Sequence, residues 1–198
     1  MAKLQQRTVQ LTEPRALRAL AHPIRLELIS QLRRGGPLTA TQAGERIGES
    51  AASCSFHLRQ LAKYGLVEEA GGGRGRERPW RATAVTTEWS ARGSDEESHV
   101  AGAMLTRLVV ERYFQSAMEW LERRDTEDPG WVDAAGISDA LVYMTEAELR
   151  GFDRAVRALL EPYLKRLEEL TPPPEGARPV NIIGLALPLP EEQRKQER

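Results

Sequence analysis

Cysteine, histidine and aromatic residues are scarce in this chain of 198 residues, which holds one cysteine, three histidines and 6% aromatic residues. A single cysteine excludes an internal disulfide framework and fits a reducing compartment, so we expect a cytoplasmic protein. The longest apolar runs fall far short of the roughly 20 residues of a membrane span, and no signal-peptide apolar region opens the chain. We therefore expect no membrane partner, and 40% apolar residues suffice for a core.

Patterns that mark catalytic and metal sites are missing as well. The sequence has no Ser/His/Asp or Cys/His arrangement, and the glycine-rich segment 71–76 does not match a phosphate-binding loop. The three histidines, His22, His57 and His99, fall in separate predicted elements, and Cys54 stands alone on an inward helix face. We therefore predict no enzyme, no cofactor and no metal site, and a core role for Cys54 in preference to a redox switch. A metal site at a dimer interface involving His99 stays open.

Aspartate is absent from residues 1–85, and this absence reveals an uneven charge distribution. That segment holds 14 basic residues against 7 glutamates, a net charge of +7, whereas residues 86–198 hold 14 basic against 22 acidic residues, a net charge of −8. Such asymmetry is typical of a polyanion-binding domain joined to an acidic one. The alternative is a chance excess of arginine from GC-rich coding DNA, since 24 of the 28 basic residues are arginine.

Helical periodicity and helix caps predict four helices in the basic half. Their predicted starts are Thr12, Pro23, Thr39, which forms a capping box with Gln42, and Ser50. The third helix ends at Gly48, only two residues before the fourth begins. Two short helices joined by a tight glycine-containing turn predict a helix-turn-helix.

The fourth predicted helix has two different faces. Its inward residues are Ala51, Cys54, Leu58, Leu61 and Ala62. Its outward residues are Ser53, Phe56, Arg59, Gln60 and Lys63, with His57 and Tyr64 on the flanks. The outward face combines donors, acceptors and two cations without a carboxylate, as a helix in the major groove of DNA requires. The alternative is a solvated surface helix.

A β-hairpin is predicted after this helix. Residues 66–70 and 77–83 have the composition of strands, and the glycine-rich turn between them carries Arg74 and Arg76. Glycine lets a backbone approach closely, so these arginines are expected at phosphates or in a narrow minor groove.

Three segments resemble ArsR-type regulators of the winged helix-turn-helix class. They are LRALAHPIRL at residues 17–26, SFHLRQL at residues 55–61, and YGLV at residues 64–67, which leads to the arginine-bearing hairpin. The resemblance implies a DNA-binding domain over residues 12–86 and a homodimer that places two recognition helices about 34 Å apart on an inverted repeat. Metal-sensing members carry cysteine pairs or carboxylate and histidine clusters that are missing here, so metal sensing is not expected.

The predicted function is a transcriptional regulator that binds double-stranded DNA. Its predicted contact residues are Thr39, Thr41, Ser50, Ser53, Ser55, Phe56, His57, Arg59, Gln60, Lys63, Arg74, Arg76 and Arg78. The alternative is a winged-helix protein-interaction module without sequence-specific DNA binding, but such a module would tolerate acidic residues on the recognition face.

The acidic half is predicted to combine a long helix with a small α+β module. A capping-box spacing of Ser94 and Glu97 opens a dimerisation helix over residues 94–124, which can also pack within its own subunit. The module at residues 131–190 is expected to have strands at 140–144 and 179–187 around a helix that begins at Thr145 and is kinked or divided by Pro162. Residues 1–11 are expected to form an arm, and residues 191–198 a charged tail. The predicted fold class is mainly α with small β.

Aromatic residues gather near the end of the long helix. They suggest a pocket for an unidentified small-molecule effector, although ordinary core packing is the competing interpretation. The candidate pocket residues are Tyr113, Phe114, Met118, Trp120, Trp131 and Tyr143.

Overall fold

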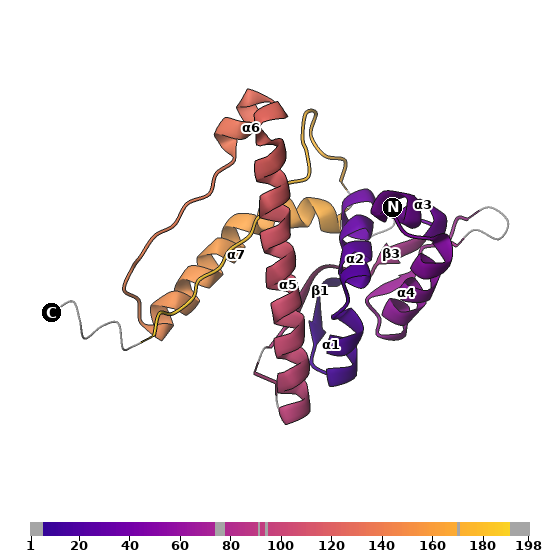
Figure 1. The fold of residues 1–198 in the computed structure, drawn as a ribbon, viewed down its shortest axis with the longest axis horizontal. Helices are drawn as coiled ribbons and strands as arrows, with labels where there is room; N and C mark the ends of the chain where they lie inside the picture. The colour runs from indigo at the N-terminus through magenta and orange to yellow at the C-terminus, as the bar shows by residue number, and fades with distance from the viewer. Residues whose placement is uncertain (1–5, 74–77, 91, 94, 170, 191–198) are drawn as a thin grey trace.

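The computed structural model describes residues 6–73, 78–90, 92–93, 95–169 and 171–190 (Figure 1). Its elements, in chain order, are β1 (Gln6–Leu11), α1 (Pro14–Leu20), α2 (Pro23–Gly35), α3 (Ala40–Ile47), α4 (Ala51–Lys63), β2 (Val67–Glu69), β3 (Trp80–Ala82), β4 (Ala84–Trp89), α5 (Glu96–Arg123), the 3₁₀ turn η1 (Arg124–Thr126), α6 (Pro129–Ala134) and α7 (Glu146–Glu168). The prediction of a mainly helical chain with small β-sheets is confirmed. Within the described ranges, no helix has the length and apolarity needed to cross a membrane.

Local signals set the ends of the helices around the helix-turn-helix. The ring nitrogen Nδ1 of His22 accepts a hydrogen bond from the backbone N–H of Ile24 at 3.2 Å, which caps α2. Thr39 forms the predicted capping box of α3, and Ser50 caps α4. The first helix differs from its prediction, because α1 begins at Pro14 and no side chain caps it.

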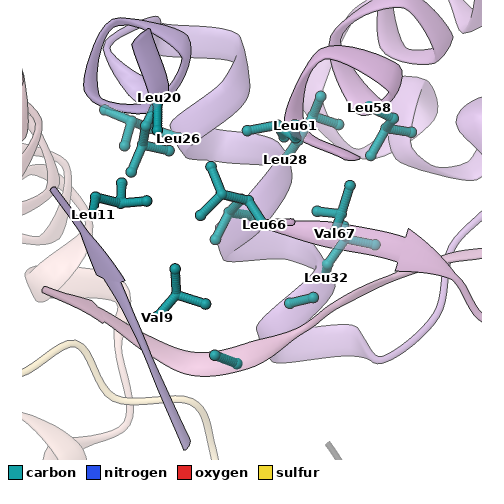
Figure 2. Packing of buried hydrophobic residues seen from close by; sticks show 14 of the residues in the cluster. Val9, Leu11, Leu20, Leu26, Leu28, Leu32, Leu58, Leu61, Leu66 and Val67 are labelled. Atoms are coloured by element: carbon teal, nitrogen blue, oxygen red, sulfur yellow. The ribbon is translucent and has the colours of Figure 1, made fainter. Parts of the chain in front are cut away.

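Leucine side chains from α1, α2 and α4 meet the inward faces of the strands in one core (Figure 2). Leu28, Leu58 and Leu61 are completely buried. Each buried leucine contributes about 1.5–3 kcal/mol relative to an exposed one, so this cluster holds the helix-turn-helix together. Long helix α5 adds Ala101, Leu105 and others to the same core. The predicted domain end at residue 86 therefore cuts through the core, because α5 completes it.

Two two-stranded sheets flank these helices. The hairpin strands β2 and β3 pair antiparallel, with Val67 opposite Ala82, as the wing prediction requires. Residues 1–5 of the predicted N-terminal arm lie outside the described residues, and its remainder forms β1, which pairs parallel with β4 in a register that sets Thr8 opposite Thr86. Two parallel strands this far apart in sequence leave no local signal, and β1 is fixed instead by burial of Val9 on the core.

Helix α5 begins one residue later than predicted. Its N-cap is Asp95, whose carboxylate accepts the backbone N–H of Ser98 at 2.8 Å, and it runs to Arg123. Ser94 lies outside the described residues. The buried positions of α5 follow one face, and α1 packs against that face.

The strands predicted in the acidic half do not form. Residues 135–145 and 171–190 have no strand or helix and are almost entirely exposed. Strands need a neighbouring strand for their backbone hydrogen bonds, and apolar composition alone does not supply one. Helix α7 does form, with the predicted Thr145 and Glu148 capping box, and it continues through Pro162 undivided. The α+β module is thus a helix between two extended segments.

Candidate nucleic-acid interface

Helix α4 buries most of its predicted inward side chains, with the exception of Ala51, which is exposed. Cys54, Leu58 and Leu61 are buried without remaining exposure, whereas Arg59 and Lys63 are exposed and Phe56 is 51% exposed. Of the remaining predicted contacts, Thr41 and Ser50 are exposed, and Thr39, Ser53, Ser55 and Gln60 are half-buried. Most of the predicted contact residues therefore lie on α4 or at its N-terminus, and the others lie at the start of α3.

The two cations of α4 contact neutral groups. Arg59 donates from Nη1 to the hydroxyl oxygen of Ser55 at 3.0 Å, one turn earlier, and the ammonium of Lys63 lies 5.8 Å from the ring centroid of Tyr64. Within the part of the chain that the structure describes, neither cation forms an ion pair. Because α4 itself carries no carboxylate, this face stays positive and ready for an anionic partner.

The wing arginines are arranged differently. Arg78 donates to both carboxylate oxygens of Glu69 at 3.0 and 3.2 Å, and Arg81 pairs with Glu68. Arg78 is exposed, so its pair is weak and a phosphate can replace the carboxylate. Arg74 and Arg76, the predicted tip contacts, lie outside the described residues.

His57, expected on the flank of the outward face as a DNA contact, is buried instead. It is only 8% exposed, its ring centroid lies 4.6 Å from that of His22, and Phe56 meets it edge-on at 5.2 Å. The 100° spacing places His57 at the boundary between the two faces, and the ring of His22 covers it from the start of α2. His57 is therefore a support beneath Phe56 and not a surface contact.

Burial controls the charge state of this support. Desolvation, followed by the nearby charge of Arg25, lowers the pKa of His22. Desolvation also lowers the pKa of His57, helped by His22 and Arg25 and opposed by Glu49. Nδ1 of His57 is buried and has no hydrogen-bond partner among the described residues. Both rings are therefore neutral at neutral pH and pack like aromatic groups.

Cys54 occupies the core position expected for it. It is fully buried, and desolvation raises the pKa of its thiol, with a smaller contribution from Glu49. A raised thiol pKa disfavours the reactive thiolate. No group of three His, Cys, Asp or Glu residues suited to a metal ion occurs among the described residues, and Nδ1 of His99 lies 3.2 Å from the carbonyl of Arg92.

The aromatic residues proposed as an effector pocket do not form an enclosure. Phe114 and Tyr143 are 69% and 80% exposed, and Met118 is also exposed. Tyr113 packs on the core, and Trp131 lies under the guanidinium of Arg178 at 4.9 Å from its ring centroid. Trp120 is half-buried on α5. An open depression on α7 shares no residue with this set.

One exposed cation of the helix-turn-helix escaped the sequence prediction. Arg46 lies in the last turn of α3 and, among the described residues, has no ion pair. Its signal was a basic residue in the last turn of a predicted helix, nearly opposite the buried Gly44.

Comparison with known proteins matches this part of the chain. Residues 20–70 match a family described as a helix-turn-helix domain. Over 51 residues, 26% of this chain, the sequence is 47% identical to the HTH-type transcriptional regulator NmtR of Mycobacterium tuberculosis (strain ATCC 25618 / H37Rv). The match covers 42% of that relative, so the chain spans less than half its length.

A solved structure aligns with a larger share of the chain. It is the homodimeric winged helix-turn-helix domain of a Mycobacterium bovis protein described as a possible ArsR-family transcriptional regulator. The alignment covers 49% of this chain and 77% of that one, at 22% identity and a TM-score of 0.32. The resemblance of the N-terminal half to ArsR-type regulators, inferred from its motifs, is confirmed by the sequence relative.

Proposed function

We propose that this chain, whose N-terminal half carries a winged helix-turn-helix like that of ArsR-type regulators, is a cytoplasmic transcriptional regulator that binds an inverted repeat of DNA as a homodimer. The observation that carries the proposal is the outward face of α4, where Arg59 and Lys63 are exposed beside Phe56 with no carboxylate on the helix. A helix of this charge and size fits the major groove.

Each side chain of the proposed interface has a role that its chemistry suits. Arg59 is assigned to a guanine edge, because a guanidinium can donate twice to O6 and N7. The ring of Phe56 is assigned to a thymine methyl, and Ser53 and Gln60 to neighbouring base edges. Lys63, at the end of the helix, is assigned to a phosphate.

In this proposal, the wing and helix α3 contact the sugar-phosphate backbone of the DNA. Arg78, together with Arg74 and Arg76, is assigned to phosphates or the minor groove, and Thr39, Thr41, Ser50 and Ser55 to phosphate oxygens near the helix starts. The +7 net charge of residues 1–85 supports attraction to DNA over distance, while the −8 of the remaining residues keeps the other half of the molecule away from it.

The test is fluorescence anisotropy with a labelled duplex at several salt concentrations. The wild type should lose affinity steeply with salt, and Arg59→Ala should weaken binding by about 5- to 150-fold, the equivalent of roughly 1–3 kcal/mol. Arg154→Ala is the matched control, because Arg154 is also an exposed helical arginine, but on α7. Binding that does not depend on salt, or equal losses in both variants, would contradict the proposal and favour a protein-interaction module.

The proposal includes independence from metal ions. Treatment with a chelator, and addition of divalent zinc or nickel, should leave the DNA affinity unchanged within about twofold, because the motifs that hold metals in ArsR-type sensors are missing from this sequence. A large change in affinity on adding either ion would overturn this part of the proposal.

A further inference from the structure

Helix α5 has a second apolar face that its own chain leaves uncovered. The exposed residues of this face, named here the α5 stripe, are Val100, Met104, Val110, Phe114 and Met118. At about 100° per residue they fall within one third of the helix circumference, opposite the buried Leu105 and Val109. One side of α5 completes the core, and the other side exposes the apolar α5 stripe, which the exposed ion pair of Arg107 and Glu111 interrupts at its middle.

The segment after α6 also exposes apolar side chains, and more of them than α5 does. Residues 135–190, named here the C-terminal arm, include the 23 residues of α7, all described by the structure and none of them buried. The exposed large apolar residues of the arm are Ile137, Leu141, Val142, Tyr143, Met144, Phe152, Leu159, Tyr163, Leu167, Val180, Ile182, Leu185, Leu187 and Leu189. Isolated chains rarely expose an apolar surface this extensive unless a partner covers it.

The total surface area of the chain points to the same conclusion. A compact monomer of 22.2 kDa exposes about 9,400 Å² according to the scaling of surface with mass. This chain exposes 14585 Å², which is roughly 5,000 Å² more. Obligate homodimers bury about 2,000–5,000 Å² summed over both partners, or about 1,000–2,500 Å² per chain, so the excess of one chain is large enough for an extensive dimer interface.

Ion pairs hold the arm in a position that leaves both apolar surfaces open. Arg7 on β1 pairs with Glu161 of α7 at 2.5 Å, and Arg157 of α7 pairs with Glu88 on β4. After α7, Arg178 donates to both carboxylate oxygens of Glu127 at 2.8 Å. The chain thus leaves α5 at α6, turns back through α7 and returns to the end of α5, enclosing an open loop of backbone (Figure 1).

We propose that a second copy of this chain fills these surfaces, with the C-terminal arm of each copy packed on the α5 stripe of the other. A two-fold arrangement covers the arm and the α5 stripe of both copies at once, because each chain supplies one apolar arm and one α5 stripe. The extended segments 140–144 and 179–187 would then find in the partner the cover that their apolar sequences require. This inference rests on the homodimer of the proposed function, but not on DNA binding.

Light scattering of the full-length chain after size exclusion tests the oligomeric state. We expect a dimer of about twice 22.2 kDa, in which Leu187→Asp raises the dissociation constant at least about tenfold, or roughly 1.4 kcal/mol, by placing a charge in the interface. Ala177→Asp, in the same arm outside the apolar segments, should change it less than about twofold. Because both positions are exposed within one chain, neither change should unfold it. A monomeric wild type, or a Leu187→Asp variant that dimerises normally, would overturn the inference.

Cross-linking identifies which surfaces meet. Two differently tagged copies, one with Phe114→Cys and the other with Leu187→Cys, are mixed and treated with a short bismaleimide; the native Cys54 is buried and should stay unmodified. The inference predicts a cross-link between the two tagged copies. Cross-links of Phe114→Cys only to itself, or of Leu187→Cys only to itself, would contradict the packing of arm on stripe.

DNA binding separates this inference from the proposed function. Leu187→Asp should keep salt-dependent binding to nonspecific duplex, because α4 is unchanged, while Arg59→Ala should remain a dimer with weakened DNA binding. A wild-type chain that forms the dimer but does not bind DNA would count against the proposed function alone. A Leu187→Asp variant that binds DNA and remains dimeric would count against the arm exchange alone.

Discussion

Phe56 and His57 are neighbours on α4 with opposite environments, and they show how single residues divide between stability and recognition. Phe56 is half exposed over the edge of the His57 ring, whereas His57 is buried against His22 from the start of α2. Projection of the sequence onto a helix finds the centres of the two faces, but not a residue at their boundary, because a neighbouring helix decides whether that residue is covered. The contact between His22 and His57 joins residues 35 positions apart, and no local pattern reports it.

The histidine pair predicts a dependence of stability on pH. Since folding lowers the pKa of both rings below the usual value of 6.5, the unfolded chain binds their protons more readily. The stabilising contribution is therefore present above pH 6.5 and is lost as the pH falls through the lower, folded pKa. Thermal unfolding should show a falling midpoint from about pH 7.5 to about pH 5.

Variants identify the groups responsible for this dependence. His57→Gln should flatten the part of the profile just below pH 6.5, while His99→Gln, at an exposed histidine of α5, should leave the profile parallel to the wild type. A wild-type midpoint that stays constant or rises over this range would show that the buried pair does not titrate as described.

Leu58 and Phe56 provide a second test at the residue scale. Leu58→Ala removes a fully buried side chain and should lower the free energy of unfolding by about 2–5 kcal/mol. Phe56→Ala should cost much less in stability, since half of its side chain is exposed, but should weaken DNA binding. Chemical denaturation combined with anisotropy measures both; equal stability losses in the two variants would contradict the assigned faces of α4.

At the scale of elements, local and non-local signals differ in how well they predict the fold. The capping boxes at Thr39 and Thr145 can be predicted from the sequence because each involves residues three positions apart. The pairing of β1 with β4 cannot, because it joins Thr8 to Thr86 and gives no short-range pattern. Strands were predicted at 140–144 and 179–187 from their apolar composition, which instead marks surfaces that the single chain leaves open.

The turn between α3 and α4 packs closely against Gly44 of α3. A Cβ atom on Gly44 would overlap the backbone carbonyl oxygen of Glu49, whereas on Gly35 it would meet only the flexible end of the Arg46 side chain. Gly44→Ala should therefore displace α4 from α3, lowering the unfolding midpoint and DNA affinity together, while Gly35→Ala should be tolerated. Circular dichroism melts of both variants test this prediction, and an unaffected Gly44→Ala protein would refute the tight turn.

At the scale of the whole molecule, the formal net charge of −1 combines two halves of opposite sign. The cations of α4 lie in the N-terminal body, and α5 joins this body to the acidic arm while completing its core with Leu105. The sequence predicted this division of charge and the winged helix-turn-helix, because both follow from composition and short motifs. It did not predict the open arm, because the burial of apolar segments by a partner is not visible in the pattern of one chain.

Selection of bound sequences from a random pool of duplex DNA tests the central claim most directly. The wild-type chain should enrich an inverted repeat whose half-sites lie about 10 base pairs apart, centre to centre, or a multiple of that spacing, because two α4 helices would enter successive major grooves of one face. Arg59→Ala should relax the preference at one position in each half-site. No enrichment above the starting pool, or a single site without symmetry, would contradict a dimeric DNA-binding regulator.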